Sequence, residues 1–141
     1  MKPRYMMDTD MCIYLKNRRP PEIAERFQQL QTGSVVISLI TYGELYNGAM
    51  KSRESKAALN NLQRLSERIP VQSMSTEVAQ HYGEIRSYLE KRGTPIGGND
   101  LWIAAHAIAL NLTLITNNTR EFKRVPKLKF ENWLNINPST N

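Results

Sequence analysis

Short apolar runs recur along the chain, separated by longer stretches whose apolar residues have helical spacing. Residues 5–7 form such a run, which stops at the polar Asp8, and residues 35–37 form a β-branched run that stops at Ser38. Residues 112–115 form a third run. Short runs bounded by polar residues are typical of strands buried on both faces. The pattern therefore predicts three buried strands.

The stretches between these runs predict helices. Apolar spacing and glycine or proline punctuation place them at about residues 11–15, 20–33, 39–50, 57–68, 75–92 and 99–108. Ser38 and Asn99 are expected to cap the helices that they precede. Weaker strands are expected at residues 69–74, which contain Pro70, and at residues 128–130.

Alternation of strands and helices along the whole chain predicts an α/β fold: a three-layer α/β/α domain with a central, mainly parallel sheet. The chain has 141 residues, of which 40% are hydrophobic, so it can build one sizeable core. No internal repeat or linker interrupts it. We therefore expect a single domain over residues 1–135, followed by a polar tail at residues 136–141.

Composition indicates which cellular compartment and which kinds of binding partner to expect. No apolar run is long enough to span a bilayer, and the N-terminus does not have the pattern of a signal peptide. A single cysteine, Cys12, excludes an internal disulfide, so we expect a cytoplasmic protein with no membrane partner. Lys and Arg number 19 against 13 Asp and Glu, which gives a net charge of +6 and favours a polyanion such as RNA or DNA.

Three acids have apolar neighbours in the sequence or lie at the expected start of a helix, whereas most other acids have charged neighbours. Asp8 follows the first strand, Glu44 lies on the helix after the second, and Asp100 lies in the first turn of the helix before residues 112–115. Ligands of open α/β sheets collect at the carboxyl ends of strands. Carboxylates without a histidine or cysteine partner favour Mg²⁺ or Mn²⁺, which can activate a water and neutralise phosphate. Helix capping alone would also explain an acid at position 8 or 10.

Other residues with chemical potential have simpler explanations. We expect His106 to be a buried structural histidine, and Trp102 and Trp133 to pack in the core. Gly97 and Gly98 lack the spacing and the lysine of a phosphate-binding loop and are expected to allow a tight turn.

Four motifs, recurring in order over nearly the whole chain, resemble those of PIN-domain ribonucleases, and specifically those of VapC-type toxins from bacterial type II toxin–antitoxin pairs. They are residues 7–9 (MDT), 40–49 (ITYGELYNGA), 93–107 (GTPIGGNDLWIAAHA) and 116–122 (TNNTREF). The resemblance implies Mg²⁺- or Mn²⁺-dependent endonucleolytic cleavage of RNA, above all tRNA or another RNA of translation. It also implies a homodimer and a VapB-like antitoxin that wraps the toxin and blocks its site, with operator DNA bound only through the antitoxin.

The resemblance also assigns residues. Asp8, Glu44 and Asp100 match the metal-binding and catalytic acids of the family. Where many PIN domains have a fourth acid this chain has Asn118, and Glu121 could supply the missing charge. Arg120 is a candidate for contact with RNA phosphate.

Asp10 departs from the family pattern, which usually has asparagine there. The added charge bears on metal affinity, and it leaves another enzyme open: Asp8-Thr9-Asp10 after an apolar strand imitates the nucleophile and acid–base pair of haloacid-dehalogenase-like phosphatases. Cys12 is unusual for those enzymes, and no downstream acids paired with a lysine are evident. A catalytically dead PIN domain that only binds is the other alternative, and the three retained acids argue against it.

Overall fold

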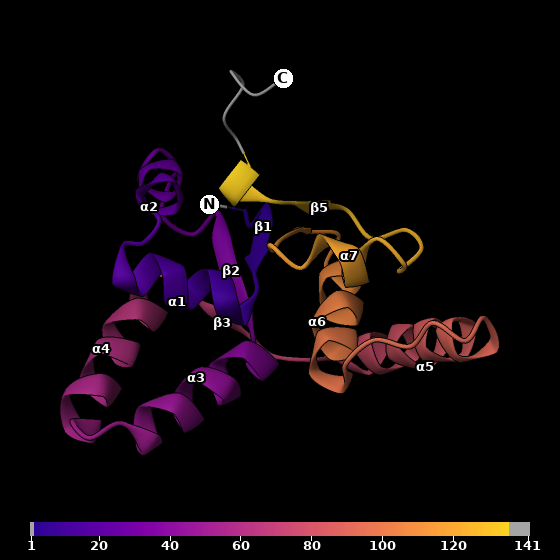
Figure 1. Cartoon of the computed structure of the whole chain (residues 1–141), viewed down its shortest axis with the longest axis horizontal. Helices are drawn as coiled ribbons and strands as arrows, with labels where there is room; N and C mark the ends of the chain where they lie inside the picture. The colour runs from indigo at the N-terminus through magenta and orange to yellow at the C-terminus, as the bar shows by residue number, and fades with distance from the viewer. Residues whose placement is uncertain (1, 136–141) are drawn as a thin grey trace.

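The computed structural model describes residues 2–135 (Figure 1). The strands are β1 (Tyr5–Met7), β2 (Val35–Ser38), β3 (Val71–Gln72), β4 (Thr113–Ile115) and β5 (Phe130–Glu131). The helices are α1 (Thr9–Asn17), α2 (Pro21–Gln28), α3 (Leu39–Lys51), α4 (Ser55–Arg68), α5 (Thr76–Lys91), α6 (Gly98–Ala109), α7 (Thr119–Phe122) and the 3-10 helix η1 (Trp133–Asn135). The tail predicted at residues 136–141 lies outside the described residues.

The strands form one sheet with the order β3-β2-β1-β4-β5, and each neighbouring pair is parallel. Met6 at the centre of the sheet lies opposite Val36 on one side and Leu114 on the other. The predicted α/β fold with a central parallel sheet is thus confirmed. Since all five strands run the same way, their carboxyl ends meet at one edge of the sheet.

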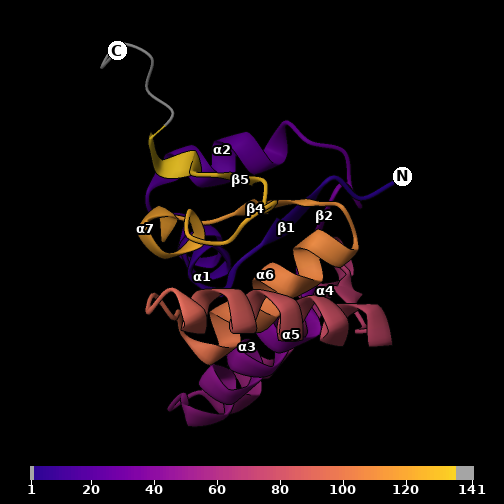
Figure 2. The same ribbon diagram turned by 90° about the vertical axis from the view of Figure 1, so that its right-hand side faces the viewer.

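Both faces of the sheet are covered, because successive strand residues point to opposite sides. One face packs against α5 and α6, and its core includes Met6, Val36, Leu89, Ala104 and Leu114. The other packs against α1, α2 and η1, and its core includes Met7, Met11, Ile23, Ile37 and Trp133. Figure 2 shows α2 on one side of the sheet with α5 and α6 on the other. Burial on both faces explains why the strands read as continuous apolar runs.

Local signals placed most elements correctly. Ser38 caps α3 as expected, its Oγ accepting a hydrogen bond of 3.1 Å from the amide of Ile40. The second helix ends at Gln28 and not near Gly33, because the chain tightens there: the amide of Leu30 bonds the carbonyl of Phe27, only three residues back. The outer strands β3 and β5 are shorter than, or shifted from, the runs that predicted them.

The prediction that Asn99 caps a helix is wrong. Helix α6 begins at Gly98, and Gly97 occupies the cap position, two residues before Asn99. Asn99 therefore lies inside the first turn, and its amide points to Glu44. Among the described helices, none combines the length and the apolar character that a bilayer span needs.

Candidate functional site

The acidic residues singled out in the sequence lie at the carboxyl edge of the sheet. Asp8 follows β1 directly, and Asp100 lies in the first turn of α6. Glu44 lies on α3, the helix that follows β2 directly. Asn118 and Glu121 come from the turn and the short helix α7 after β4. The parallel sheet thus gathers, at one edge, side chains that lie far apart in the sequence.

Asp8 is the most buried of these acids, with 5% of its surface exposed. It caps α1, because its Oδ1 accepts a hydrogen bond of 3.0 Å from the amide of Met11. Burial raises the pKa of Asp8 to about 7, and the charges of Asp10 and Asp100 add to this rise, against the opposing effect of hydrogen bonds from Thr116 and Met11. Capping and membership of the acidic cluster are therefore both properties of Asp8.

Asp100 is half-buried beside a second acid. Burial, followed by the charge and the hydrogen bond of Glu121, raises the pKa of Asp100 to about 6, with further contributions from Glu44 and Asp10. The Nδ2 of Asn118 donates to Asp100 Oδ2 over 3.4 Å. Glu121 itself has a buried Oε1 with no hydrogen-bond partner within residues 2–135. An unsatisfied buried carboxylate oxygen costs free energy unless a cation or a proton compensates it.

Glu44 is oriented from two directions. The hydroxyl of Thr9, on α1, donates to Glu44 Oε1, and the Nδ2 of Asn99, on α6, donates to Oε2 over 3.0 Å. The Thr9 hydroxyl also lies 3.3 Å from that of Thr41 on α3. Glu44 is thus linked to the elements that carry the other two acids, since Thr9 follows Asp8 directly and Asn99 precedes Asp100.

The donor set suits a hard divalent cation. The candidate carboxylate ligands offer only oxygen, carry like charges, and include the unsatisfied oxygen of Glu121. Within the part of the chain that the structure describes, no three acidic, histidine or cysteine side chains converge tightly enough to enclose a metal ion by themselves. Mg²⁺ commonly binds through one or two carboxylates and keeps several waters. The residues therefore suit an Mg²⁺ or Mn²⁺ ion that keeps several of its waters, and not an ion enclosed by protein ligands alone.

Asp10 and Arg120 flank the cluster from outside. Asp10 is exposed in the first turn of α1, where its charge raises the pKa of both Asp8 and Asp100. It does not cap the helix, since Asp8 occupies that position. Arg120 is exposed on α7, directly before Glu121 in the sequence.

Sequence reasoning gave no role in the site to three polar residues: Thr9, Asn99 and Thr116. Each stands next to a recognised feature, since Thr9 follows Asp8, Asn99 precedes Asp100, and Thr116 directly follows β4. Position at the carboxyl end of a parallel strand, or beside a candidate acid, is the signal that could have singled them out.

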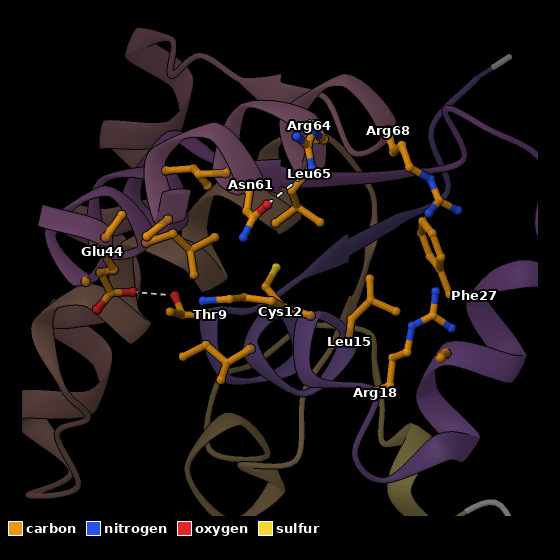
Figure 3. Close-up of a pocket in the computed structure, with 18 of the residues that line it drawn as sticks. Thr9, Cys12, Leu15, Arg18, Phe27, Glu44, Asn61, Arg64, Leu65 and Arg68 are labelled. Atoms are coloured by element: carbon orange, nitrogen blue, oxygen red, sulfur yellow. Dashed lines mark hydrogen bonds between the residues drawn. The ribbon is translucent and has the colours of Figure 1, made fainter. Parts of the chain in front are cut away.

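A groove of about 780 Å³ runs from the acidic site between α1, α3 and α4 (Figure 3). Thr9 and Glu44 stand at one end, and Phe27 and Arg68 at the other. Its apolar lining includes Cys12, Leu15, Leu45, Leu62 and Leu65. Its basic rim consists of Lys16, Arg18, Arg64 and Arg68. Among the described residues, no carboxylate forms a salt bridge with this rim.

The structural prediction for His106 is confirmed. The ring is fully buried in α6, with Nδ1 2.8 Å from Ser38 Oγ and Nε2 3.1 Å from the carbonyl oxygen of Ser73. Burial lowers the pKa of His106, which favours the neutral ring. Trp133 is also buried, edge-on to Tyr5, and Trp102 stacks on Tyr82 at 3.8 Å between ring centroids.

Fold and site together define a known class of protein. A family model described as PIN domain matches residues 5–128, which is most of the chain. The chain belongs to the PIN-domain family.

Relatives within the family confirm the resemblance to VapC-type proteins. The chain is 44% identical over 130 residues to ribonuclease VapC1 of Haemophilus influenzae, covering 92% of this chain and 97% of that one. It is 40% identical over 130 residues to a tRNA(fMet)-specific endonuclease VapC of Salmonella typhimurium, covering 92% and 98%. The structure matches VapBC2 of Rickettsia felis, solved with a promoter DNA fragment, with a TM-score of 0.86, 40% identity, and coverage of 94% and 99%.

Proposed function

We propose that this protein is a toxin endoribonuclease that hydrolyses phosphodiester bonds of tRNA or another translation RNA in the cytoplasm, with Mg²⁺ or Mn²⁺ bound by its acidic site. The observation that carries the proposal is the meeting of Asp8, Glu44, Asp100 and Glu121 at one edge, with raised pKa values for Asp8 and Asp100 and an unsatisfied oxygen. Relatives named as ribonucleases and as a tRNA(fMet)-specific endonuclease support it. They do not favour a phosphatase or a dead binding module.

The side chains of the site have separable roles in this proposal. Asp8 and Asp100 would hold the cation, with Glu121 and Asn118 completing the negative and polar side next to Asp100. When bound, the cation supplies an activated water and neutralises phosphate charge. Glu44, held by Thr9 and Asn99, would orient a water, because both of its oxygens are fixed by donors. Arg120 would hold an RNA phosphate outside the cluster.

Cleavage of total tRNA by the purified wild-type protein tests the proposal. Cleavage is expected with Mg²⁺ or Mn²⁺ and not with excess chelator, and sequencing of the cut ends would identify the RNA and the bond. Release of inorganic phosphate from a phosphomonoester, without RNA cleavage, would contradict the proposal.

We infer that a VapB-like antitoxin neutralises the toxin by lying in the groove beside the site. Structural neighbours that are VapBC complexes support such a partner. The apolar lining and the basic rim fit an amphipathic, acidic segment. Beyond the rim, the carboxylates at the Glu44 end fit an arginine from the same partner, since its planar fork pairs well with carboxylates.

Reversing two rim charges tests this mode of inhibition. The double variant Arg64→Glu, Arg68→Glu is expected to weaken antitoxin binding at least about tenfold, roughly 1.4 kcal/mol, by setting like charges against the acidic segment. Titration calorimetry of the purified toxin with its antitoxin measures the change. The matched control is Arg53→Glu, Lys56→Glu, on the exposed connection and first turn of α4. Equal affinity of the two double variants would contradict this binding mode.

We also propose that α3 contributes to a homodimer. Leu39, Tyr46 and Met50 follow one another along one stripe of this helix and are 46%, 42% and 57% exposed. A row of large exposed apolar side chains of this kind is typical of a protein contact.

A further inference from the structure

A run of basic side chains leads away from the acidic site along the chain from α7 to β5. This basic strip consists of Arg120, Lys123, Arg124, Lys127 and Lys129. All are exposed except Arg124, which is half-buried. The one acid from position 119 to 130 is Glu121, which faces Asp100 in the acidic site. The strip is therefore cationic along its whole length.

No carboxylate of the described residues forms a salt bridge with the strip. In the region that the structure describes, salt bridges join Arg26 to Glu131 and Arg86 to Glu90, but none involves the strip. The Nζ of Lys129 donates to the neutral side chain of Asn111 over 3.1 Å, and Arg124 donates to the carbonyl of Pro95 over 3.1 Å. Arg124 thereby ties the strip to the loop before Asp100, while the three lysines keep their charges available.

The path of the strip follows from the topology. It begins on α7, next to Asn118 and Glu121 at the carboxyl edge, and β5 then runs parallel to β4. The chain must therefore return from the carboxyl ends of the strands to their amino ends before β5 begins, as Figure 2 shows. Lys129 marks that far end, where its carbonyl accepts a hydrogen bond of 2.9 Å from the amide of Leu114.

Lys127 adds a backbone observation. Its φ is +70°, a left-handed conformation that favours glycine or asparagine. A lysine in this conformation costs some stability without any compensating hydrogen bond or salt bridge of its side chain among the described residues. Strained positions with exposed functional side chains are candidates for binding.

We propose that the basic strip binds the sugar–phosphate backbone of the RNA substrate beyond the cleaved bond, through Lys123, Lys127 and Lys129. This inference rests on the proposed function and extends it from Arg120 at the site to a second, remote contact with the same RNA. Lysines bind phosphates as point charges without reading sequence, so the strip contributes affinity and direction but not base specificity. The three lysines are positioning residues and take no part in the chemistry.

A triple variant, Lys123→Gln, Lys127→Gln, Lys129→Gln, tests the proposal against a matched control. The control is Lys51→Gln, Arg53→Gln, Lys56→Gln, which removes the same charge from the exposed end of α3, the connection after it and the start of α4, at a distant corner of the molecule (Figure 1). Cleavage of total tRNA is expected to show a KM at least about tenfold higher for the strip variant, with kcat unchanged. Binding of a short labelled single-stranded RNA, measured in chelator, should depend less steeply on salt. The slope of log affinity against log salt is expected to become shallower by about 0.7 for each phosphate that the variant no longer neutralises.

The outcomes separate this inference from the proposed function. Absence of cleavage by the wild-type protein, with RNA binding still dependent on the strip, would reject the proposed function and keep the strip as an RNA-binding surface. Equal RNA binding and equal salt slopes for the two triple variants would overturn the proposal that the strip binds RNA, whatever the wild-type activity. Weaker antitoxin binding by the strip variant with unchanged RNA binding would overturn it as well, by assigning the strip to a protein partner.

Discussion

Replacing Asp100 by asparagine is expected to lower the rate of RNA cleavage by about a thousandfold or more, which corresponds to roughly 4 kcal/mol of transition-state stabilisation. Asparagine has nearly the same shape but no negative charge, so the site would lose both cation affinity and the activated water. Asn118 can still bond the new side chain, and the fold should be kept. Cleavage of total tRNA, followed at several Mg²⁺ and Mn²⁺ concentrations, measures the loss.

Glu84→Gln is the matched control, because it also replaces a carboxylate by its amide, on a side chain that is 77% exposed on α5. Both variants should have the circular dichroism spectrum of the wild type. Wild-type turnover by the Asp100→Asn protein would reject Asp100 as part of the catalytic site.

Replacing Asp8 by asparagine is expected to stabilise the metal-free protein at pH 8. Burial raises the pKa of Asp8 from 3.8 to about 7, so the folded protein binds more protons than the unfolded chain between these values. The contribution of Asp8 to stability is therefore fully present below pH 3.8 and is lost as the pH rises through about 7. Removing the ionised group should recover roughly 2–4 kcal/mol at pH 8, or about 5–10 °C in Tm.

Thermal melts in chelator at pH 5 and pH 8 decide this prediction. The wild-type Tm should fall between the two values, and the fall should be smaller for Asp8→Asn, which retains a good helix cap. Excess Mg²⁺ should then stabilise the wild type more than the variant, since the cation offsets charges that the variant lacks. Asp10→Asn is expected to change both quantities in the same direction but less, because Asp10 is exposed. Identical pH dependence of the wild type and Asp8→Asn would show that Asp8 does not carry this effect.

The central strands and the acids at their ends could be predicted because both depend on local patterns. The runs at β1 and β2 are short and are bounded by Asp8 and Ser38, and a parallel sheet brings the residues after such strands to one edge. The outer strands were harder to place, since β3 and β5 are each only two residues long and half-buried. A strand this short has too few residues to show a period.

The supporting contacts of the site could not be predicted, because they join residues from different elements. The position of Asn99 before a helical segment indicated a cap, yet its amide is turned to Glu44 on a different helix, 55 positions earlier in the chain. The groove depends in the same way on how α1, α3 and α4 pack, and its basic rim is drawn from two separate helices and the residue after α1. Spacing along a sequence carries no information about such relative placement.

The buried imidazole of His106 connects the elements that position the acidic site. A carbonyl can only accept, so Nε2 carries the proton and donates to Ser73, and Nδ1 accepts from the hydroxyl of Ser38, which itself accepts from the amide of Ile40. These three hydrogen bonds, all donated in the same direction, connect the start of α3 through α6 to the segment after β3. These hydrogen bonds fix the helix that carries Glu44 and the helix that carries Asp100 relative to each other inside the hydrophobic core, so the fold itself sets the spacing of the two carboxylates.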